Sequence, residues 1–267
     1  MNKTKVLFIL QQMEPYLPEN LMSKKGKELP QNIQQKGKEI RIFMPRYGFI
    51  KERRYQLHEV IRLSGMNIIV NDTDHSLIIK VASIPQARMQ VYFIDNEEFF
   101  HRKATFYDEE GNFYEDNDER AIFYSKSVLE TIKKLRWSPD IVYIQGWLAA
   151  LVPIYIRKLY TEDPIFSNTK IITALFNDGF TETLNQKMKK KAKYEGITDR
   201  DLSLINTPNY VNLMKLALKY SNGAVLEENN INPEITDYIK KLKIPVLEAT
   251  NENYIDEHNQ FYDKLLS

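Results

Sequence analysis

Residues 3–10, KTKVLFIL, form a short apolar run after a charged start, and this pattern predicts a buried parallel strand. The chain then turns at Pro15 and Pro18 into a segment that can be helical, and IRIFMP (40–45) reads as a second buried strand. We interpret this layout as strand, loop, helix, strand, which is the opening unit of a doubly wound α/β fold. In such a fold the loop after the first strand faces the ligand crevice.

That first loop has no glycine where it approaches the predicted helix. Glycine at this place lets backbone N–H groups come close to a phosphate, but the chain has Pro18, Glu19, Asn20 and Leu21. Pro18 donates no N–H, and Glu19 adds a negative charge. We therefore expect this turn to be poorly suited to binding a pyrophosphate.

Further apolar segments extend the predicted sheet. DIVYIQ (140–145), KIITALF (170–176) and GAVLEE (223–228) read as strands, and the first two are preceded by segments that can be helical. Residues 56–94 alternate β-branched and apolar side chains around a turn at 71–74, which indicates an antiparallel extension of the sheet. The predicted fold is therefore α/β, Rossmann-like and doubly wound, with a mostly parallel sheet.

Two segments have the periodicity of amphipathic helices. Residues 118–136 carry apolar side chains on one face, and residues 207–221 predict a second helix with Thr207 as its N-cap. Between them, residues 181–200 are polar and rich in lysine. We interpret that stretch as a solvated helix face in preference to an anion or glucan contact.

Composition limits the class of protein. The 267 residues are 43% hydrophobic, enough for one large α/β domain, and the 37 basic side chains nearly balance the 36 acidic ones. No global field favours nucleic acid, so we expect no nucleic-acid partner. The sequence has no cysteine, which excludes disulfides and thiolate sites. No stretch approaches the roughly 20 apolar residues of a membrane-spanning helix, and we expect a soluble, cytoplasmic protein.

The histidines and clustered carboxylates do not predict a catalytic or metal site. The four histidines are His58, His75, His101 and His258. None lies in metal-ligand spacing or beside a nucleophile at a predicted strand end, and we expect all four at the surface. The acidic stretches 72–74 and 108–110 are typical of turns. We therefore expect neither a metal nor a cofactor.

Five segments occur in the order seen in one enzyme family. They are KVLFILQQMEPYLPENLMSKKGKELPQNIQQKGKEIRIFMPRYGFI (5–50), VYFIDNEEFFHRK (91–103), FYEDNDERAIFYSKSVLE (113–130), PDIVYIQGWLAALVP (139–153) and ITALFNDGF (172–180). Together they resemble the amino-terminal part of bacterial glycogen and plant starch synthases. Each motif alone is moderately specific, but the shared order over residues 5–180 makes chance similarity a poor explanation.

The resemblance implies the N-terminal half of a GT-B glycosyltransferase, without a metal. It implies hexosyl transfer from ADP-glucose or UDP-glucose to an α-1,4-glucan, with the glucan held largely by the amino-terminal domain. We expect residues 1–267 to be a single such domain, with a core over 1–228 and a helical tail over 229–267. On this expectation the second, nucleotide-binding domain is absent, and a protein partner supplies or replaces it.

The family's motifs can be placed residue by residue. Lys-Thr-Gly-Gly falls on Pro18, Glu19, Asn20 and Leu21; His-Asp-Trp falls on Gln145, Gly146 and Trp147; and the histidine of Thr-x-His-Asn falls on Phe176. The phosphate-binding lysine and both histidines are therefore replaced. The residues that match and could line a sugar crevice are Tyr92, Asp95, Asn117, Trp147 and Asn177. Structural roles for three of them stay open, with Asp95 and Asn117 as helix caps and Trp147 as a packing residue.

Two functions remain in competition, and no catalytic residue is assigned under either. The first is a divergent glycogen or starch synthase subunit that transfers little or no glucose by itself. The second is a pseudoenzyme that binds a glucan or a protein at the same edge, with Leu21, Leu148 and Phe176 as an apolar contact surface. A small-molecule enzyme of new chemistry has little support.

Overall fold

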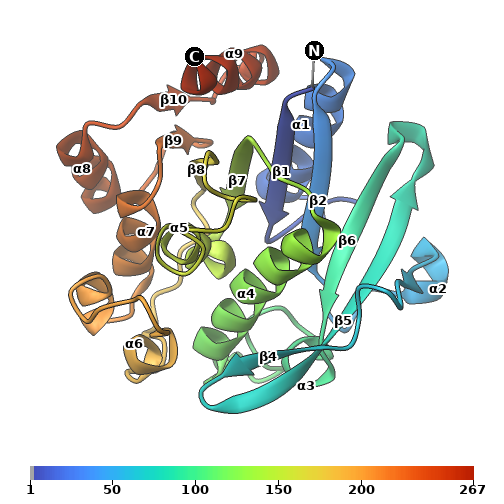
Figure 1. The fold of residues 1–267 in the computed structure, drawn as a ribbon, viewed down its shortest axis with the longest axis vertical. Helices are drawn as coiled ribbons and strands as arrows, with labels where there is room; N and C mark the ends of the chain where they lie inside the picture. Colours follow the sequence, from blue (N-terminus) through green and yellow to red (C-terminus); the bar gives the residue numbers. More distant parts are fainter. Residues whose placement is uncertain (1–2) are drawn as a thin grey trace.

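A computed structural model describes residues 3–267, and a single twisted sheet runs through the chain (Figure 1). The strands are β1 (Lys5–Leu10), β2 (Glu39–Pro45), β3 (His58–Glu59), β4 (Met66–Val70), β5 (Thr73–Ile84), β6 (Met89–Asp95), β7 (Ile141–Gln145), β8 (Lys170–Leu175), β9 (Gly223–Leu226) and β10 (Val246–Glu248). Their order across the sheet is β10-β9-β8-β7-β1-β2-β6-β5-β3, and β4 pairs with β5. The expected α/β class is confirmed.

The sheet is parallel from β10 to β6 and antiparallel beyond it. The antiparallel extension predicted over 56–94 comprises β3, β4, β5 and β6. Its tight turn between β4 and β5 has positive φ at Asn71 (50°) and Asp72 (61°). Two consecutive positive φ angles match the right-handed twist of a hairpin, and Asn and Asp tolerate them best after glycine.

Helices cover both faces of the parallel part. They are α1 (Leu21–Gln35), α2 (Glu52–Tyr55), α3 (Glu97–Phe100), α4 (Asn117–Leu135), α5 (Val152–Lys158), α6 (Met188–Lys191), α7 (Tyr210–Lys219), α8 (Pro233–Leu242) and α9 (Tyr254–Leu266). The chain runs from β1 outward to β6 and returns to β7 on the other side of β1. Right-handed crossovers then place α1 on one face and α4, α5 and α7 on the other, and α9 packs with α1.

This reversal makes a topological switch point between β1 and β7, at the carboxyl ends of both strands. The run of five buried residues from Val6 to Leu10 explains why β1 is central, since a strand with neighbours and helices on all sides is apolar throughout. Helix α1 begins directly after the switch-point loop. Asn20 and Ser23 form a reciprocal capping box there, which fixes the start of the helix.

Two helical predictions need correction. The helix predicted over 207–221 begins at Tyr210, and Asn209 caps it in place of Thr207 because the Asn209 side chain accepts from the Asn212 N–H. The lysine-rich stretch 181–200 contains only the single turn α6. Within that turn Lys191 is buried, and its Nζ lies 2.8 Å from both Asp118 and Glu119, so part of the supposed solvated face is a packed ion pair.

The histidine prediction is half wrong. His58 and His101 are exposed, but His75 and His258 are buried. His75 lies on the buried face of β5, and its ring lies 4.5 Å from that of Phe99. His258 is fully enclosed on α9. Sequence spacing did not reveal these environments because each depends on an element far away in the chain.

The segment 229–267 is helical at α8 and α9, but it also contains β10, which pairs in parallel with β9 and extends the main sheet. Lys36 and Lys38 at the end of α1 form ion pairs with Asp256 and Asp263 of α9. Figure 1 accordingly places α9 and the start of β1 at the same end of the molecule. Within residues 3–267, no helix combines the length and the apolar character that crossing a membrane requires.

Candidate functional site

A pocket of about 330 Å³ lies at the switch point. It is lined by Gln12, Asn20, Leu21, Met22, Phe176, Asn177, Asp178 and Glu228. These residues follow β1, β8 and β9 or begin α1, so the carboxyl edge of the parallel sheet brings them together. Four of the positions singled out in the sequence, Asn20, Leu21, Phe176 and Asn177, therefore meet in one place.

Amide groups hold α1 against the strand ends beneath this pocket. Asn20 Nδ2 donates to Gln12 Oε1 at 2.7 Å, and the Gln12 N–H donates to Gln145 Oε1 at 3.1 Å. Gln145 Nε2 in turn donates to the Met22 carbonyl at 2.9 Å, and the Gln145 side chain is fully buried. A Cβ at Gly26 would lie 2.4 Å from the Gln12 carbonyl oxygen, so glycine is required for this close approach. Gln145 and Asn20 thus have structural partners here.

Asp178 is the carboxylate at the centre of the hydrogen bonds around this pocket. It accepts from the Tyr210 hydroxyl at 2.8 Å and, at 3.4 Å, from the Trp147 N–H and from Gln11 Nε2. Burial raises the pKa of Asp178 to about 6, against the lowering effect of these hydrogen bonds. Sequence reasoning did not single out Asp178. Its place three residues after a parallel strand, beside Asn177, was the available signal.

The loop after β7 is fixed by a glycine. Gly146 has φ of 82°, and a Cβ there would lie 2.6 Å from the Gln11 side chain. Gln11 also accepts from the Leu148 N–H at 3.0 Å through its Oε1. Glycine is therefore needed both for the backbone conformation and for the contact. Trp147 follows directly and is only 1% exposed.

The charges at the switch-point pocket are negative. Asp178 and Glu228 line it, and no lysine or arginine within residues 3–267 does so. Glu228 Oε1 accepts from the Asn177 N–H at 3.2 Å. The Asn20 side chain accepts a hydrogen bond from the Ser23 N–H, one of the backbone donors at the start of α1 that have no partner within the helix. The pocket is thus lined by two carboxylates, and one backbone donor at the start of α1 already has an acceptor.

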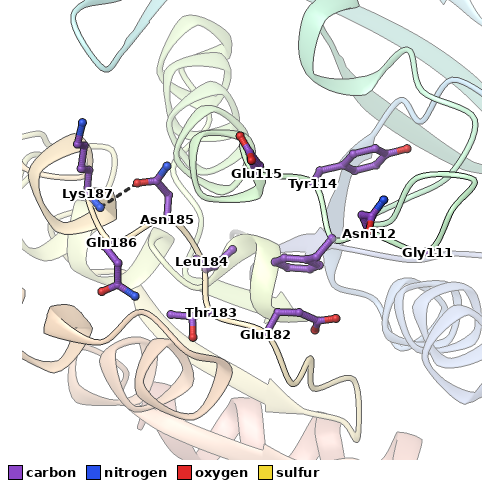
Figure 2. Close-up of a pocket in the computed structure, with 11 residues that line it drawn as sticks. Gly111, Asn112, Tyr114, Glu115, Glu182, Thr183, Leu184, Asn185, Gln186 and Lys187 are labelled. Carbon is purple, nitrogen blue, oxygen red and sulfur yellow. Dashed lines mark hydrogen bonds between the residues drawn. The ribbon is translucent and has the colours of Figure 1, made fainter.

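A larger pocket of about 750 Å³ lies between residues 111–115, which precede α4, and residues 182–187, which follow β8. Figure 2 shows the two segments around the same space, with Asn112 and Tyr114 from the first and Glu182, Thr183 and Leu184 from the second. The lining combines the apolar ring of Phe113 with amide, hydroxyl and carboxylate groups, and it also includes Tyr114, Leu184 and Lys187.

Aromatic rings stack beneath this larger pocket. The ring of Phe113 lies 5.0 Å from that of Phe180 with an interplanar angle of 28°, and Trp147 lies 5.1 Å from Phe180. Trp147 also packs 4.6 Å from Phe106. The Tyr107 hydroxyl donates to Glu182 at 3.1 Å and ties the two segments together. Trp147 therefore supports the pocket from behind.

The structure places the other predicted crevice residues away from both pockets. Tyr92 lies in the middle of β6, where its hydroxyl accepts from Arg41 at 2.7 Å. Asp95 is 1% exposed and lies 2.9 Å from Lys80 and 2.8 Å from His101. Asn117 is fully buried and donates to the Phe106 carbonyl at 2.9 Å.

Two of the suggested structural roles change, and so does the suggested contact surface. Asp95 does not cap a helix, because Asn96 accepts from the Phe99 N–H and caps α3. Asn117 is the first residue of α4, and its side chain makes no cap. The proposed apolar contact surface does not form, since Leu148 is fully buried and Phe176 is 2% exposed, which leaves Leu21 at 43%.

A second carboxylate of this sheet edge, Glu227, is fully buried. Lys25 Nζ lies 2.7 Å from its Oε2, while the Tyr143 hydroxyl (2.7 Å) and His258 Nε2 (2.9 Å) reach its Oε1. His258 Nδ1 faces the Tyr254 carbonyl at 2.7 Å, so both ring nitrogens lie beside oxygen atoms. Burial alone would raise the pKa of Glu227, but His258 and Lys25 outweigh it and lower that pKa to about 2.

Comparison with known proteins gives a consistent family. The family model described as the starch synthase catalytic domain matches residues 5–242. A glycogen synthase of Chlorobium phaeobacteroides is 30% identical over 249 residues, which cover 85% of this chain and 51% of that protein. A glycogen synthase of Chlorobium limicola is 34% identical over 174 residues, which cover 65% of this chain and 36% of that protein.

A solved structure has a similar fold. It is the catalytic domain of starch synthase IV from Arabidopsis thaliana bound to ADP and acarbose, which superposes with a TM-score of 0.68 at 18% identity. The match covers 93% of this chain and 52% of that one. Where the match covers most of this chain, it covers about half the length of the relative.

Proposed function

The chain belongs to the starch synthase catalytic domain family, and from that premise we propose that it binds an α-1,4-glucan in the pocket between residues 111–115 and 182–187. The single observation that carries this proposal is the lining of that pocket, an aromatic ring set among amide, hydroxyl and carboxylate groups (Figure 2). A glucose ring has apolar C–H faces and a rim of hydroxyls, so it needs both kinds of partner.

The geometry suits a chain of sugar units better than a single one. The pocket volume of about 750 Å³ is at the upper part of the usual range for ligand sites. Asn112, Thr183 and Asn185 each offer polar atoms that can exchange hydrogen bonds with hydroxyls. The Phe113 ring is held in place by stacking on Phe180, so little side-chain freedom is lost when a sugar packs on it.

We further propose that the residues of this chain do not hold the diphosphate of a nucleotide sugar at the switch point. Support comes from the two carboxylates in that pocket, from Pro18 and Glu19 in the loop above it, and from the capping box that occupies the start of α1. A diphosphate carries several negative charges and is repelled by carboxylates at short range. The chain alone is therefore expected to bind glucan and to transfer little glucose.

Glycogen co-sedimentation and radiolabel transfer from ADP-glucose and UDP-glucose, run on the same purified chain, test both parts. We expect co-sedimentation without transfer. Phe113→Ala removes the aromatic face and should weaken glycogen binding about tenfold, the equivalent of one aromatic contact. Tyr238→Ala is the matched control, because Tyr238 is also a half-buried aromatic but lies on α8, outside this pocket.

Label transfer by the chain alone would overturn the second part and leave the first intact. Equal glycogen binding by the Phe113→Ala and Tyr238→Ala variants, or no co-sedimentation at all, would overturn the first. The alternative function, a protein scaffold that uses Leu21, Leu148 and Phe176 as an apolar contact surface, has no such surface, since two of these three side chains are buried.

A further inference from the structure

A third pocket, of about 450 Å³, shares no lining residue with the two pockets described above. It is lined by Arg46, Gly48, Phe49, His101, Arg102 and Lys103. Residues 46–49 follow β2, and residues 101–103 follow the short helix α3 after β6. Since β2 and β6 are parallel neighbours, their carboxyl ends bring the two loops together.

The two loops are held in close contact by backbone hydrogen bonds. The Arg46 N–H donates to the Ile94 carbonyl at 2.8 Å, and the Gly48 N–H donates to the Phe100 carbonyl at 2.7 Å. A Cβ at Gly48 would lie 2.5 Å from the Arg102 carbonyl oxygen, so only glycine permits this approach. The backbone of the pocket is therefore fixed before any ligand arrives.

Every side chain of this lining that can carry a charge is basic. The carboxylates that pair with them lie outside the lining: Arg46 pairs with Glu52, His101 with Asp95, Arg102 with Asp116 and Lys103 with Glu109. The basic groups thus line the pocket, and each has a carboxylate partner that does not line it. This is the reverse of the switch-point pocket, which presents Asp178 and Glu228.

Two of these groups have bonding capacity to spare. Arg46 is only 9% exposed, and its buried Nε makes no hydrogen bond within the described part of the chain. A buried guanidinium N–H without an acceptor is unfavourable. Lys103 is 78% exposed, and its partner Glu109 is 67% exposed. Such a surface pair is weak and exchanges readily for a stronger anion.

We propose that this pocket binds a phosphate monoester. A phosphate group has several oxygens and close to two negative charges, which suits guanidinium groups better than a single carboxylate does. Arg46 and Arg102 supply the planar donors, and Lys103 supplies a mobile charge. Phe49, stacked 5.8 Å from Tyr47 with an interplanar angle of 2°, offers an apolar face to the carbon skeleton of the ester.

Calorimetric titration of the purified full chain with glucose 6-phosphate, inorganic phosphate and glucose tests this site. We expect the two phosphates to bind and glucose not to bind there. Lys103→Gln should weaken phosphate binding about fivefold, and Arg46→Lys, which keeps the charge but loses Nε, about tenfold. Lys240→Gln is the matched control, since Lys240 is 76% exposed and pairs with Asp237 at 2.9 Å, as Lys103 pairs with Glu109.

The comparison of glucose 6-phosphate with inorganic phosphate shows whether the site binds a sugar ester or free phosphate. Tighter binding of glucose 6-phosphate identifies a sugar ester, and equal binding identifies free phosphate; both support the site. Absence of phosphate binding, or an equal effect of Lys103→Gln and Lys240→Gln, overturns it. Thermal unfolding shows whether the Arg46→Lys variant is folded. If that variant is unfolded, the Lys103→Gln variant, changed at an exposed position, tests the site alone. Glycogen co-sedimentation of the same variants should be unchanged, which separates this test from that of the proposed function.

Discussion

Asp178 and Glu227 follow neighbouring strands at the same edge of one sheet, yet their pKa values are shifted in opposite directions. The pKa of Asp178 is raised from 3.8 to about 6, whereas that of Glu227 is lowered from 4.5 to about 2. Burial acts on both in the same sense, because it disfavours a charge. The difference must therefore come from their partners.

Asp178 is surrounded by neutral donors, and Glu227 by cations. The hydroxyl of Tyr210 and the amide of Gln11 stabilise a carboxylate only partly. Lys25 Nζ and His258 Nε2 lie within 3 Å of Glu227, and both residues lower its pKa. The comparison teaches that hydrogen bonds alone do not keep a carboxylate ionised at this edge. It also distinguishes the two groups: Asp178 can accept a proton beside a pocket, whereas Glu227 is a fixed charge that joins α1, β7, β9 and α9.

Glu227→Gln should have the largest effect, because it leaves two buried cations without their anion. We expect the free energy of unfolding to fall by about 3–5 kcal/mol, the range found when one partner of a buried pair is removed. Urea unfolding at pH 7 measures it. Glu234→Gln is the control, since Glu234 is 70% exposed beside Lys215 and should change stability by less than about 1 kcal/mol. Similar losses in both variants would show that the cluster has no special role.

Lys25→Met should be less damaging, because His258 and Tyr143 still neutralise and bind Glu227. We expect a loss of about 2 kcal/mol, below the full effect of breaking a buried pair. The pKa of Glu227 should rise, so the variant should lose stability at a higher pH than the native chain when acid is added. Lys24→Met is the neighbouring control, with a 52% exposed side chain 4.0 Å from Glu28. A loss at Lys25 no greater than at Lys24 contradicts the assignment.

Much of the sheet edge could be predicted from sequence, but the difference between its two carboxylates could not. Apolar runs located β1, β2, β7, β8 and β9, and the shared edge of parallel strands then brought Asn20, Phe176 and Asn177 together. Lys25, by contrast, lies in a segment that reads as a polar helix, and its partner Glu227 is 202 residues away. Acidity depends on such distant neighbours, and no local pattern encodes them.

The same limit applies to the basic pocket. The motif Pro45–Gly48 was recognised as a family match, and residues 101–103 belonged to another matched segment. Their convergence depends on the parallel pairing of β2 with β6 and on the close approach at Gly48. Tyr92 and Asp95 were placed in a crevice because they matched the family, yet they belong to β6 and have partners within the sheet.

Asp178→Asn tests the raised pKa of Asp178 through the pH dependence of stability. In the native chain the folded state holds the Asp178 proton up to about pH 6, while the unfolded state releases it near 3.8. The contribution of this group is therefore full below pH 3.8 and is lost as the pH rises through 6. Relative to the asparagine variant, the native chain should lose about 1–2 kcal/mol between pH 4 and pH 7, after a discount for partial exposure.

Urea unfolding of both chains across this pH range gives the difference directly. Glu227 does not interfere, because its own contribution is lost only as the pH falls from 4.5 toward 2. A difference between the two chains that is constant from pH 4 to pH 7 would falsify the raised pKa of Asp178.

Tyr210→Phe should have the smallest effect and isolates what one buried hydroxyl contributes. The variant removes the hydroxyl that donates to Asp178 Oδ1 at 2.8 Å and to the Phe176 carbonyl at 3.1 Å. We expect a loss of about 1 kcal/mol at pH 7.5 and a smaller loss at pH 4.5, since the bond to the ionised carboxylate is the stronger one. Tyr262→Phe is the control, because its buried hydroxyl makes no hydrogen bond within residues 3–267. If the Tyr210 effect does not grow with pH, the hydroxyl stabilises the Phe176 carbonyl alone, and Asp178 owes its remaining acidity to Gln11 and the Trp147 N–H.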